Sequence, residues 1–277
     1  MARALVHDHV PLAKLPSLHF RSRHRKSSVV IRTIALFTDF GSHDIYVGQL
    51  HGAAARRGSD CRLVDLFHDV SPFDIRAGAS LLGAMLDYLP HDVIVVGVVD
   101  PGVGGKRLPI AVELGERWLV GPDNGLFSRS VAWSTSEAQY WTLETPIDVA
   151  KTFHGRDVFL PVATDLADGD LGRIRRVEDA GGISTHRAVE EIQGDDQRVI
   201  HVDHYGNLIS GIRGAAIAPH QKIEIAGRVL AHADYYERVP AGECFWYVNS
   251  IGLLEISANQ ASAARSLGVK GGAEIAL

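Results

Sequence analysis

Short apolar segments alternate with stretches of helical periodicity from Thr33 to about two thirds of the way along the chain. "TIALFTDFG" predicts a buried strand that ends in a turn, and "DIYVGQLHGAAARRG" predicts a helix that ends at Gly58. The same order recurs in "CRLVDLFHDV", "DIRAGASLLGAMLDYLP" and "DVIVVGVVD". The last segment is an unbroken apolar run, which is typical of a sheet covered on both faces. We therefore expect an α/β domain over residues 33–192, with a central, mostly parallel sheet covered by helices.

Beyond about Gly194 the chain consists of short apolar segments interrupted by Gly and Asn. "QRVIHVDHYGNLISGI", "KIEIAGRVL" and "ECFWYVNSIGLLEIS" predict short strands, and "NQASAARSLG" predicts a closing helix. These segments indicate a smaller, antiparallel, β-barrel-like domain over residues 193–277. The acidic, glycine-containing stretch from Glu190 to Asp196 is the expected linker.

Residues 1–32 differ from the rest because they contain seven basic residues and one acidic residue. They lack the apolar core that a secretory signal requires. We expect a disordered basic tail outside the folded domains. A transit peptide, or residues upstream of the true start of the protein, are the alternatives.

Composition excludes several classes of function. The 277 residues are 46% hydrophobic and carry a net charge near −5, so there is no general attraction to nucleic acid or anionic lipid. No apolar run approaches the roughly 20 residues that a membrane-spanning helix needs. The two cysteines, Cys61 and Cys244, lie far apart and form neither a disulfide framework nor a thiolate zinc motif. A reducing cytoplasm is the expected compartment.

Polar residues follow the predicted strands where the strands end, as Thr38-Asp39, His68-Asp69 and Asp100. In an α/β sheet, ligands bind outside these carboxyl ends. The last of them opens "DPGVGGKR", which resembles a phosphate-binding loop. However, the lysine is not followed by Ser or Thr, and the third glycine of a dinucleotide fingerprint is missing. A nucleotide-phosphate role is therefore disfavoured.

Other chemistries have weaker signals. Six residues are of metal-ligand type but lack a ligand spacing, so no metal site is predicted: His68, Asp69, His154, His201, Asp203 and His204. The G-x-S-x-G elbow of a serine hydrolase is absent. Asp100 and Arg107 stand seven residues apart across a glycine turn and could face each other. By spacing alone, a structural ion pair is the favoured interpretation.

Seven ordered motifs resemble those of one family. They are "TDFGSHDIYVG", "VDLFHDVSPFDIRAGA", "VVDPGVGGKR", "VGPDNGLF", "TFHGRD", "HVDHYGNLISGI" and "VNSIGLLEISANQASAA". Together they resemble the S-adenosyl-L-methionine (SAM) hydroxide adenosyltransferases, the water-using relatives of the fluorinase and chlorinase. The resemblance implies that water displaces methionine from ribose C5′ of SAM, giving adenosine and L-methionine without a cofactor. It also implies a homotrimer with active sites between subunits.

The resemblance assigns roles residue by residue. The water-activating triad falls on Asp100, Arg107 and His154. The expected substrate-binding residues, with their implied contacts, are Asp39 (ribose hydroxyls), Phe73 and Phe153 (pocket walls), Asp203 and Asn207 (amino-acid end), Tyr205 (near adenine) and Ser250 (methionine portion). Asn249 and Glu255 lie close to this last group.

Departures from the halogenases indicate the branch. Asp100 stands where the fluorinase has a tyrosine, and Gly155 where it has the serine that binds fluoride. Both favour water. The chlorinase also has glycine at the Gly155 position, so Gly155 alone does not exclude chloride, whereas the carboxylate of Asp100 beside the nucleophile repels an anion. Ile251 replaces an arginine, which leaves the partner of the methionine carboxylate open. The alternatives are a SAM- or nucleoside-binding protein with little turnover and a chloride-dependent SAM halogenase.

Overall fold

The computed structural model describes residues 32–218 and 221–277. Of the predicted basic tail it describes only Arg32, so that prediction lies outside the described residues.

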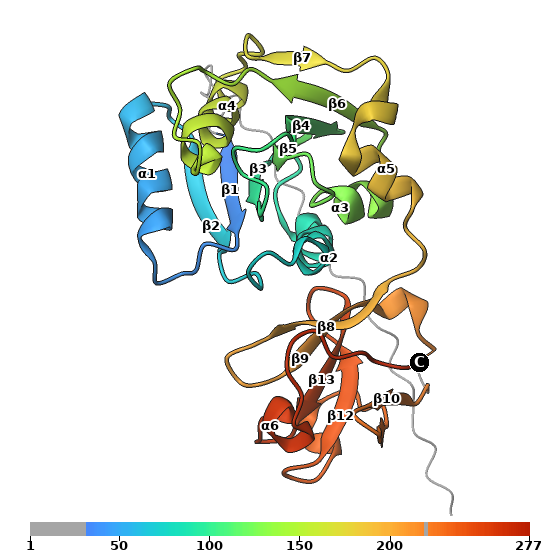
Figure 1. Cartoon of the computed structure of the whole chain (residues 1–277). Helices are drawn as coiled ribbons and strands as arrows, with labels where there is room; N and C mark the ends of the chain where they lie inside the picture. The colour runs from blue at the N-terminus through green and yellow to red at the C-terminus, as the bar shows by residue number, and fades with distance from the viewer. Residues whose placement is uncertain (1–31, 219–220) are drawn as a thin grey trace, which may run out of the picture. The chain divides into compact units, whose positions relative to one another are not determined.

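The first part of the chain forms a seven-stranded sheet in the order β2-β1-β3-β5-β4-β6-β7 (Figure 1). The four parallel strands are β1 (Thr33–Thr38), β2 (Arg62–Phe67), β3 (Ile94–Val98) and β5 (Arg117–Pro122). The antiparallel strands are β4 (Pro109–Leu114), β6 (Ala138–Leu143) and β7 (Ile174–Arg176). The predicted α/β sheet is confirmed. Its far side turns antiparallel because a tight turn at Gly115, with φ 65°, joins β4 directly to β5.

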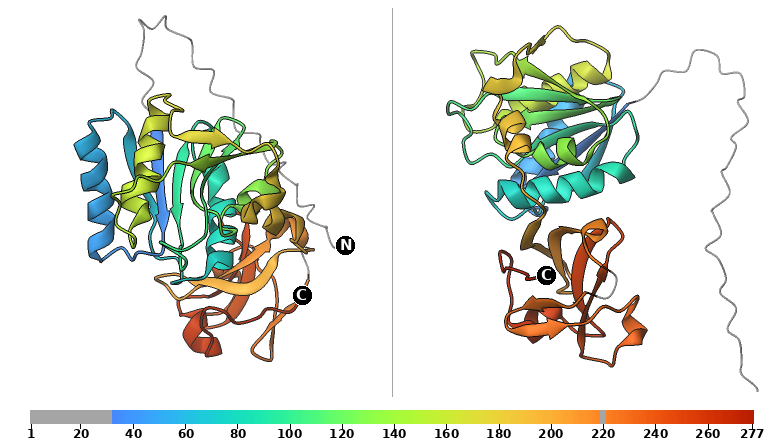
Figure 2. Two further views of the ribbon diagram at one scale, coloured as in Figure 1. Left: turned by 45° about the horizontal axis from the view of Figure 1, so that its top comes forward. Right: turned by 90° about the vertical axis from the view of Figure 1, so that its right-hand side faces the viewer.

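Helices cover both faces of this sheet. The helices are α1 (Ile45–Arg57), α2 (Ile75–Met85), α3 (Ser128–Trp133), α4 (Leu160–Ala167) and α5 (Ser184–Glu190). Successive residues of a strand point to opposite faces. Ile34 of β1 therefore packs into the core under α1 and α4, whereas Ala35 packs into the core under α2. Figure 2 shows the helices on the two sides of the sheet. Burial on both faces explains the unbroken apolar sequence of β3, which is fully buried.

The last part of the chain forms a separate antiparallel sheet in the order β12-β13-β9-β8, as predicted. Its elements are β8 (Asp196–Val202), β9 (Leu208–Arg213), β12 (Cys244–Val248) and β13 (Leu253–Ala258), with a hairpin of β10 (Ile223–Ile225) and β11 (Arg228–Leu230) and helix α6 (Ala263–Leu267). Trp246 is 1% exposed at the centre of this core. The predicted boundary between residues 192 and 193 falls between α5 and β8 and stays a prediction.

Two strands of the first sheet approach so closely that only glycine fits. A Cβ atom added to Gly121 of β5 would lie 2.2 Å from the Gly97 carbonyl oxygen and 2.8 Å from the Phe127 ring. We expect Gly121→Ala to lower the free energy of unfolding by about 1–3 kcal/mol through overpacking. Urea denaturation followed by circular dichroism measures this change.

Gly48→Ala is the matched control for that substitution. Gly48 lies within α1, and nothing stands within 4 Å of an added Cβ atom. The same Gly→Ala change should therefore stabilise the protein by about 0.5–1 kcal/mol. Equal effects of the two variants would contradict the steric argument.

Candidate active site

Two carboxylates lie beside each other at the ends of parallel strands. Thr38 at the end of β1 is paired with Val98 at the end of β3, so Asp39 and Asp100 leave the same edge of the sheet. Burial raises the pKa of the Asp39 carboxyl above its ordinary value, and the charge of Asp100 adds to this shift. A hydrogen bond from the Phe73 N–H to Asp39 Oδ2, at 3.0 Å, opposes it.

The glycine turn brings Arg107 back onto Asp100. Arg107 Nε lies 3.1 Å from Oδ1 and 3.0 Å from Oδ2 of Asp100, and Nη2 also donates to Oδ2. Their side chains are only 10% and 4% exposed. The turn requires glycine at Gly104, where φ is 73° and an added Cβ atom would lie 2.4 Å from the Lys151 carbonyl oxygen. The turn therefore packs directly against the segment that carries His154.

His154 completes a buried cluster with Asp100 and Arg107. Arg107 Nη2 lies 3.0 Å from His154 Nδ1. A guanidinium can only donate hydrogen bonds, so Nδ1 accepts and the imidazole carries its proton on Nε2. Burial, followed by the positive charge of Arg107, lowers the pKa of His154 below 6.5, which favours the same neutral form.

A π-helical turn, Gly155–Phe159, begins directly after His154 and precedes α4. Such turns are frequent at functional sites. This one brings the fully buried Phe159 beneath the cluster, with its ring centroid 5.2 Å from the Arg107 guanidinium carbon and 6.4 Å from the centroid of the His154 ring. Sequence reasoning missed Phe159, because it belongs to an apolar run indistinguishable from ordinary core.

A pocket of about 310 Å³ opens onto this cluster. Five of the predicted site residues line it: Asp39, Phe73, Asp100, Phe153 and His154. Its other lining residues are Phe40, Tyr46, Pro72, Val98, Val103, Thr152 and Gly155, none of which was assigned a binding role from the sequence. The rings of Phe40, Tyr46 and Phe153 pack against one another with centroids 5.6–5.8 Å apart. The pocket therefore combines an aromatic wall with a polar cluster.

The predicted site residues of the last sheet lie in two turns. In the β8–β9 turn, Asp203 Oδ1 accepts the N–H groups of Tyr205 at 2.9 Å and Asn207 at 2.8 Å, and Asn207 Nδ2 donates to Oδ2 at 2.8 Å. Tyr205 and Asn207 line a second pocket of about 510 Å³. Among the described residues, none of these three lines the pocket that contains Asp39 and Asp100.

Ser250 lies in the β12–β13 turn, which its neighbour Asn249 holds in shape. Asn249 Oδ1 accepts the N–H groups of Ile251 at 3.1 Å and Leu253 at 3.0 Å, and its Nδ2 donates to the buried Glu255 at 3.0 Å. Asn249 thus holds the turn, and Glu255 of β13 accepts hydrogen bonds from Asn249 and from the Tyr247 hydroxyl of β12. Ser250 is outside the 310 Å³ pocket, as are the β8–β9 turn residues.

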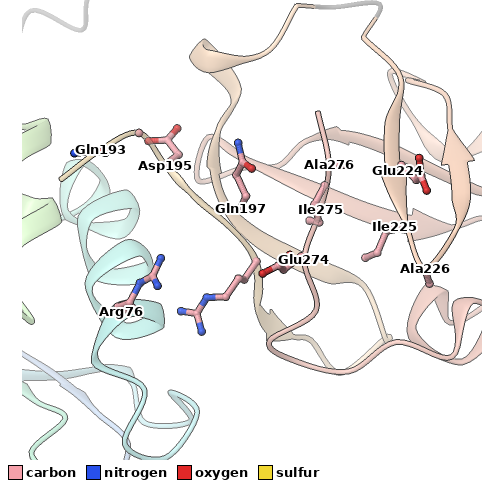
Figure 3. A pocket seen from close by; sticks show the side chains of 12 residues that line it. Arg76, Gln193, Asp195, Gln197, Glu224, Ile225, Ala226, Glu274, Ile275 and Ala276 are labelled. Carbon is pink, nitrogen blue, oxygen red and sulfur yellow. The ribbon is translucent and has the colours of Figure 1, made fainter.

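A third pocket, of about 630 Å³, contains no predicted site residue (Figure 3). It is lined by charged and amide side chains, including Arg76, Asp195, Arg198, Glu224 and Glu274. Several of these charges are paired with residues outside the lining: Arg198 lies 3.3 Å from Asp74, and Asp195 lies 2.9 Å from Arg213. Chemistry rather than volume therefore identifies the smaller pocket as the candidate site.

Two further observations concern metals and membranes. Within residues 32–218 and 221–277, no group of three or more His, Cys, Asp or Glu side chains is arranged to hold a metal ion. None of the helices in these ranges is both long and apolar enough to cross a bilayer.

Two family models match the chain, one to the part that contains the seven-stranded sheet and one to the part that contains the four-stranded sheet. The SAM hydroxide adenosyltransferase N-terminal domain matches residues 34–175, and the corresponding C-terminal domain matches residues 197–276. The chain belongs to the SAM hydroxide adenosyltransferase family. The resemblance drawn from its seven motifs is thereby confirmed.

Individual relatives agree with this assignment. The chain is 35% identical to the (R)-S-adenosyl-L-methionine hydrolase of Salinispora arenicola, over 87% of this chain and 96% of the relative. It is 35% identical to that of Thermus thermophilus, over 89% and 100%. A fluorinase of Actinopolyspora mzabensis is 21% identical over 87% and 95%. The crystal structure of an uncharacterized conserved protein from Thermotoga maritima aligns with a TM-score of 0.76 at 27% identity, over 88% and 98%.

Phe73 adopts a backbone conformation that disfavours every residue except glycine. Its φ is 67°, its side chain is 71% exposed, and its N–H donates to Asp39. We expect Phe73→Gly to be more stable than Phe73→Ala by about 1 kcal/mol, because both lose the ring but only glycine is unstrained at positive φ. Paired urea denaturation curves measure the difference. Equal stability of the two variants would contradict a strained Phe73.

Proposed function

We propose that this chain hydrolyses SAM by attack of water at ribose C5′, giving adenosine and L-methionine. We also propose that the (R) epimer at sulfur is the substrate. The observation that carries the proposal is the buried cluster of Asp100, Arg107 and His154 on the pocket that Asp39 lines. Relatives at 30–35% identity that bear the name (R)-S-adenosyl-L-methionine hydrolase support both parts.

The chemical problem is the nucleophile rather than the leaving group. Methionine departs from a sulfonium as a neutral thioether, so the departing sulfur needs no proton. Bulk water has a pKa of about 15.7, so the attacking water must lose a proton as its oxygen bonds to C5′. The C5′–S electron pair goes to sulfur. A base beside the pocket is therefore the essential group.

The hydrogen bonds of the cluster support Asp100 as the proton acceptor. His154 Nδ1 is occupied by Arg107 and Nε2 carries a proton, so in this arrangement the imidazole can only donate to water. Asp100 keeps carboxylate lone pairs beyond those that Arg107 uses. Arg107 would hold both partners in place, and His154 would orient the water. The carboxylate also disfavours a halide at the same position.

We propose for this chain the binding roles that the motif resemblance implies. Asp39 would take the ribose hydroxyls, with Phe73 and Phe153 as walls of the pocket. Asp203, Asn207 and Ser250 would bind the methionine portion, and Tyr205 would lie near the adenine. Tyr205 is 76% exposed and Phe73 71%, and the two line different pockets of the described chain.

These exposed aromatic residues favour a site shared between copies of the chain. We therefore propose a homotrimer with active sites between subunits. SAM would serve as substrate, and no separate cofactor is needed for this chemistry. Cys61 and Cys244 are both free thiols, which suits the proposed cytoplasmic location.

Hydrolysis in ¹⁸O-labelled water tests the reaction and the nucleophile together. Mass spectrometry should find the label in the adenosine 5′-hydroxyl and not in methionine. Asp100→Asn should lower kcat by about 100-fold or more, because it removes the base. The matched control is Asp87→Asn, at an aspartate whose side chain is 86% exposed, which should leave kcat unchanged.

The same experiment with an equal mixture of the two sulfonium epimers of SAM tests the stereochemistry. Only the (R) epimer should be consumed. Absence of adenosine after long incubation would contradict the proposal. Tight binding of unchanged SAM would instead identify a binding protein. Formation of 5′-chloro-5′-deoxyadenosine in high chloride would identify a halogenase.

The pH response of His154 tests the electrostatics of the cluster. Burial and Arg107 both disfavour the imidazolium, so His154 should titrate below its ordinary pKa of 6.5. Arg107→Leu should move that titration upward because one of the two causes is removed. NMR spectra of ¹³C-labelled histidine, assigned with His154→Asn, measure both values. A titration of His154 at or above 6.5 in the wild type would contradict this account.

A further inference from the structure

A buried histidine outside the pocket is linked to the loop that carries Asp39. His68 follows β2 and is 5% exposed. Its Nδ1 lies 2.7 Å from Thr38 Oγ1, and its Nε2 lies 3.1 Å from Asp65 Oδ1. His51 Nε2 of α1 lies 2.8 Å from the same carboxylate oxygen. A chain of hydrogen bonds therefore runs from the half-exposed His51 to the end of β1.

Each link in this chain has a defined direction. A carboxylate only accepts hydrogen bonds, so His68 donates to Asp65 through Nε2–H. In the neutral ring Nδ1 then accepts, and the Thr38 hydroxyl donates to it. Thr38 Oγ1 keeps a lone pair for the Phe40 N–H, at 3.2 Å. The chain thus ends on the backbone of the residue after Asp39.

The same residues satisfy most of the backbone donors of the Asp39 loop. The N–H of Asp39 donates to the Val98 carbonyl at 3.2 Å. The next three N–H groups donate in turn to Thr38 Oγ1 (from Phe40, 3.2 Å), the His68 carbonyl (from Gly41, 2.8 Å) and Asp69 Oδ1 (from Ser42, 2.9 Å). Three of the four N–H groups therefore donate to Thr38, His68 or Asp69.

We propose that His68, acting through Thr38, is a positioning residue that aims the Asp39 carboxylate at the ribose hydroxyls. This inference rests on the proposed function. Asp39 lies between two anchors, the Val98 carbonyl on one side and Thr38 Oγ1 on the other. Loss of the second anchor frees the peptide between Asp39 and Phe40 to rotate, so that the carboxylate is held mainly by the Phe73 N–H at 3.0 Å and loses its fixed aim into the pocket.

The chain of bonds does not act as a proton relay. It ends at an amide N–H, which does not exchange protons with substrate, and Thr38 is fully buried and absent from the pocket lining. Loss of positioning should therefore weaken ribose binding and raise KM, with kcat little changed. A general folding defect has the opposite signature, because fewer active molecules lower the apparent kcat while KM stays constant.

Two substitutions at His68 separate these roles. The amide oxygen of Asn reaches the position of Nδ1 and can accept from Thr38, whereas the amide of Gln lies near the position of Nε2. His68→Gln should raise KM for SAM about tenfold, through loss of a buried hydrogen-bond partner. His68→Asn should stay within about threefold of wild type. His186→Gln is the control at a histidine of α5 that does not line the pocket, and it should leave KM unchanged.

A double-mutant cycle tests whether His68 acts through Asp39. In an Asp39→Asn background, His68→Gln should change KM by less than about twofold, because residues in one network are not additive. The proposal would be overturned if the double variant raised KM by the product of the two single-variant changes, or if His68→Gln alone left KM unchanged. If His68→Gln folds poorly, Thr38→Val serves in its place. It exchanges the hydroxyl for a methyl group of similar size and should raise KM to the same extent.

Amide hydrogen exchange gives a readout that does not depend on turnover. In the full chain, the Phe40 and Gly41 amides should exchange faster in His68→Gln than in His68→Asn. Wild type without SAM hydrolysis would refute the proposed function and leave this comparison intact. Equal exchange in the two variants would refute the positioning role even if the enzyme is active.

Discussion

The parallel pairing of β1 with β3 is the constraint on which the site depends. It makes both strands end at one edge of the sheet, so Asp39 and Asp100 leave that edge side by side. Burial, and to a smaller extent the charge of Asp100, raises the pKa of the Asp39 carboxyl, so two ionised carboxylates are unfavourable at this edge. A counter-charge must therefore reach the same edge. Arg107 provides it through three hydrogen bonds to Asp100.

The position of Arg107 depends in turn on two contacts, one of the glycine turn that precedes it and one of its own guanidinium. The turn that returns it lies against the Lys151 carbonyl, which leaves room only for glycine at Gly104. Phe159, brought in by the π-helical turn, packs beneath the guanidinium. The arginine is thus held from two sides and joins Asp100 to His154. A rigid donor between a carboxylate and an imidazole fixes the hydrogen-bonding state of both groups before any substrate arrives.

Much of the fold could be predicted because its signals are local. The apolar runs of β1 and β3 and the helical period of α2 follow directly from burial on defined faces. The antiparallel strands of the first sheet were not predicted, because the sequence of an apolar segment such as β4 does not indicate whether it pairs parallel or antiparallel to its neighbour. The π-helical turn was not predicted, since its five residues are too few for a periodic pattern.

The candidate site, like the fold, was predicted only in part from the sequence. The amino-acid sequence by itself determined the family, through seven ordered motifs, and the turn that allows Asp100 and Arg107 to meet across seven residues. Only the tertiary structure decided that His154, 47 residues beyond Arg107, bonds to it through Nδ1. It alone revealed the link from His68 to Thr38 and the strained backbone of Phe73. The physical reason is that these features depend on which distant segments are packed together, and hydrogen-bond direction and backbone strain are set by that packing rather than by neighbouring residues in the chain.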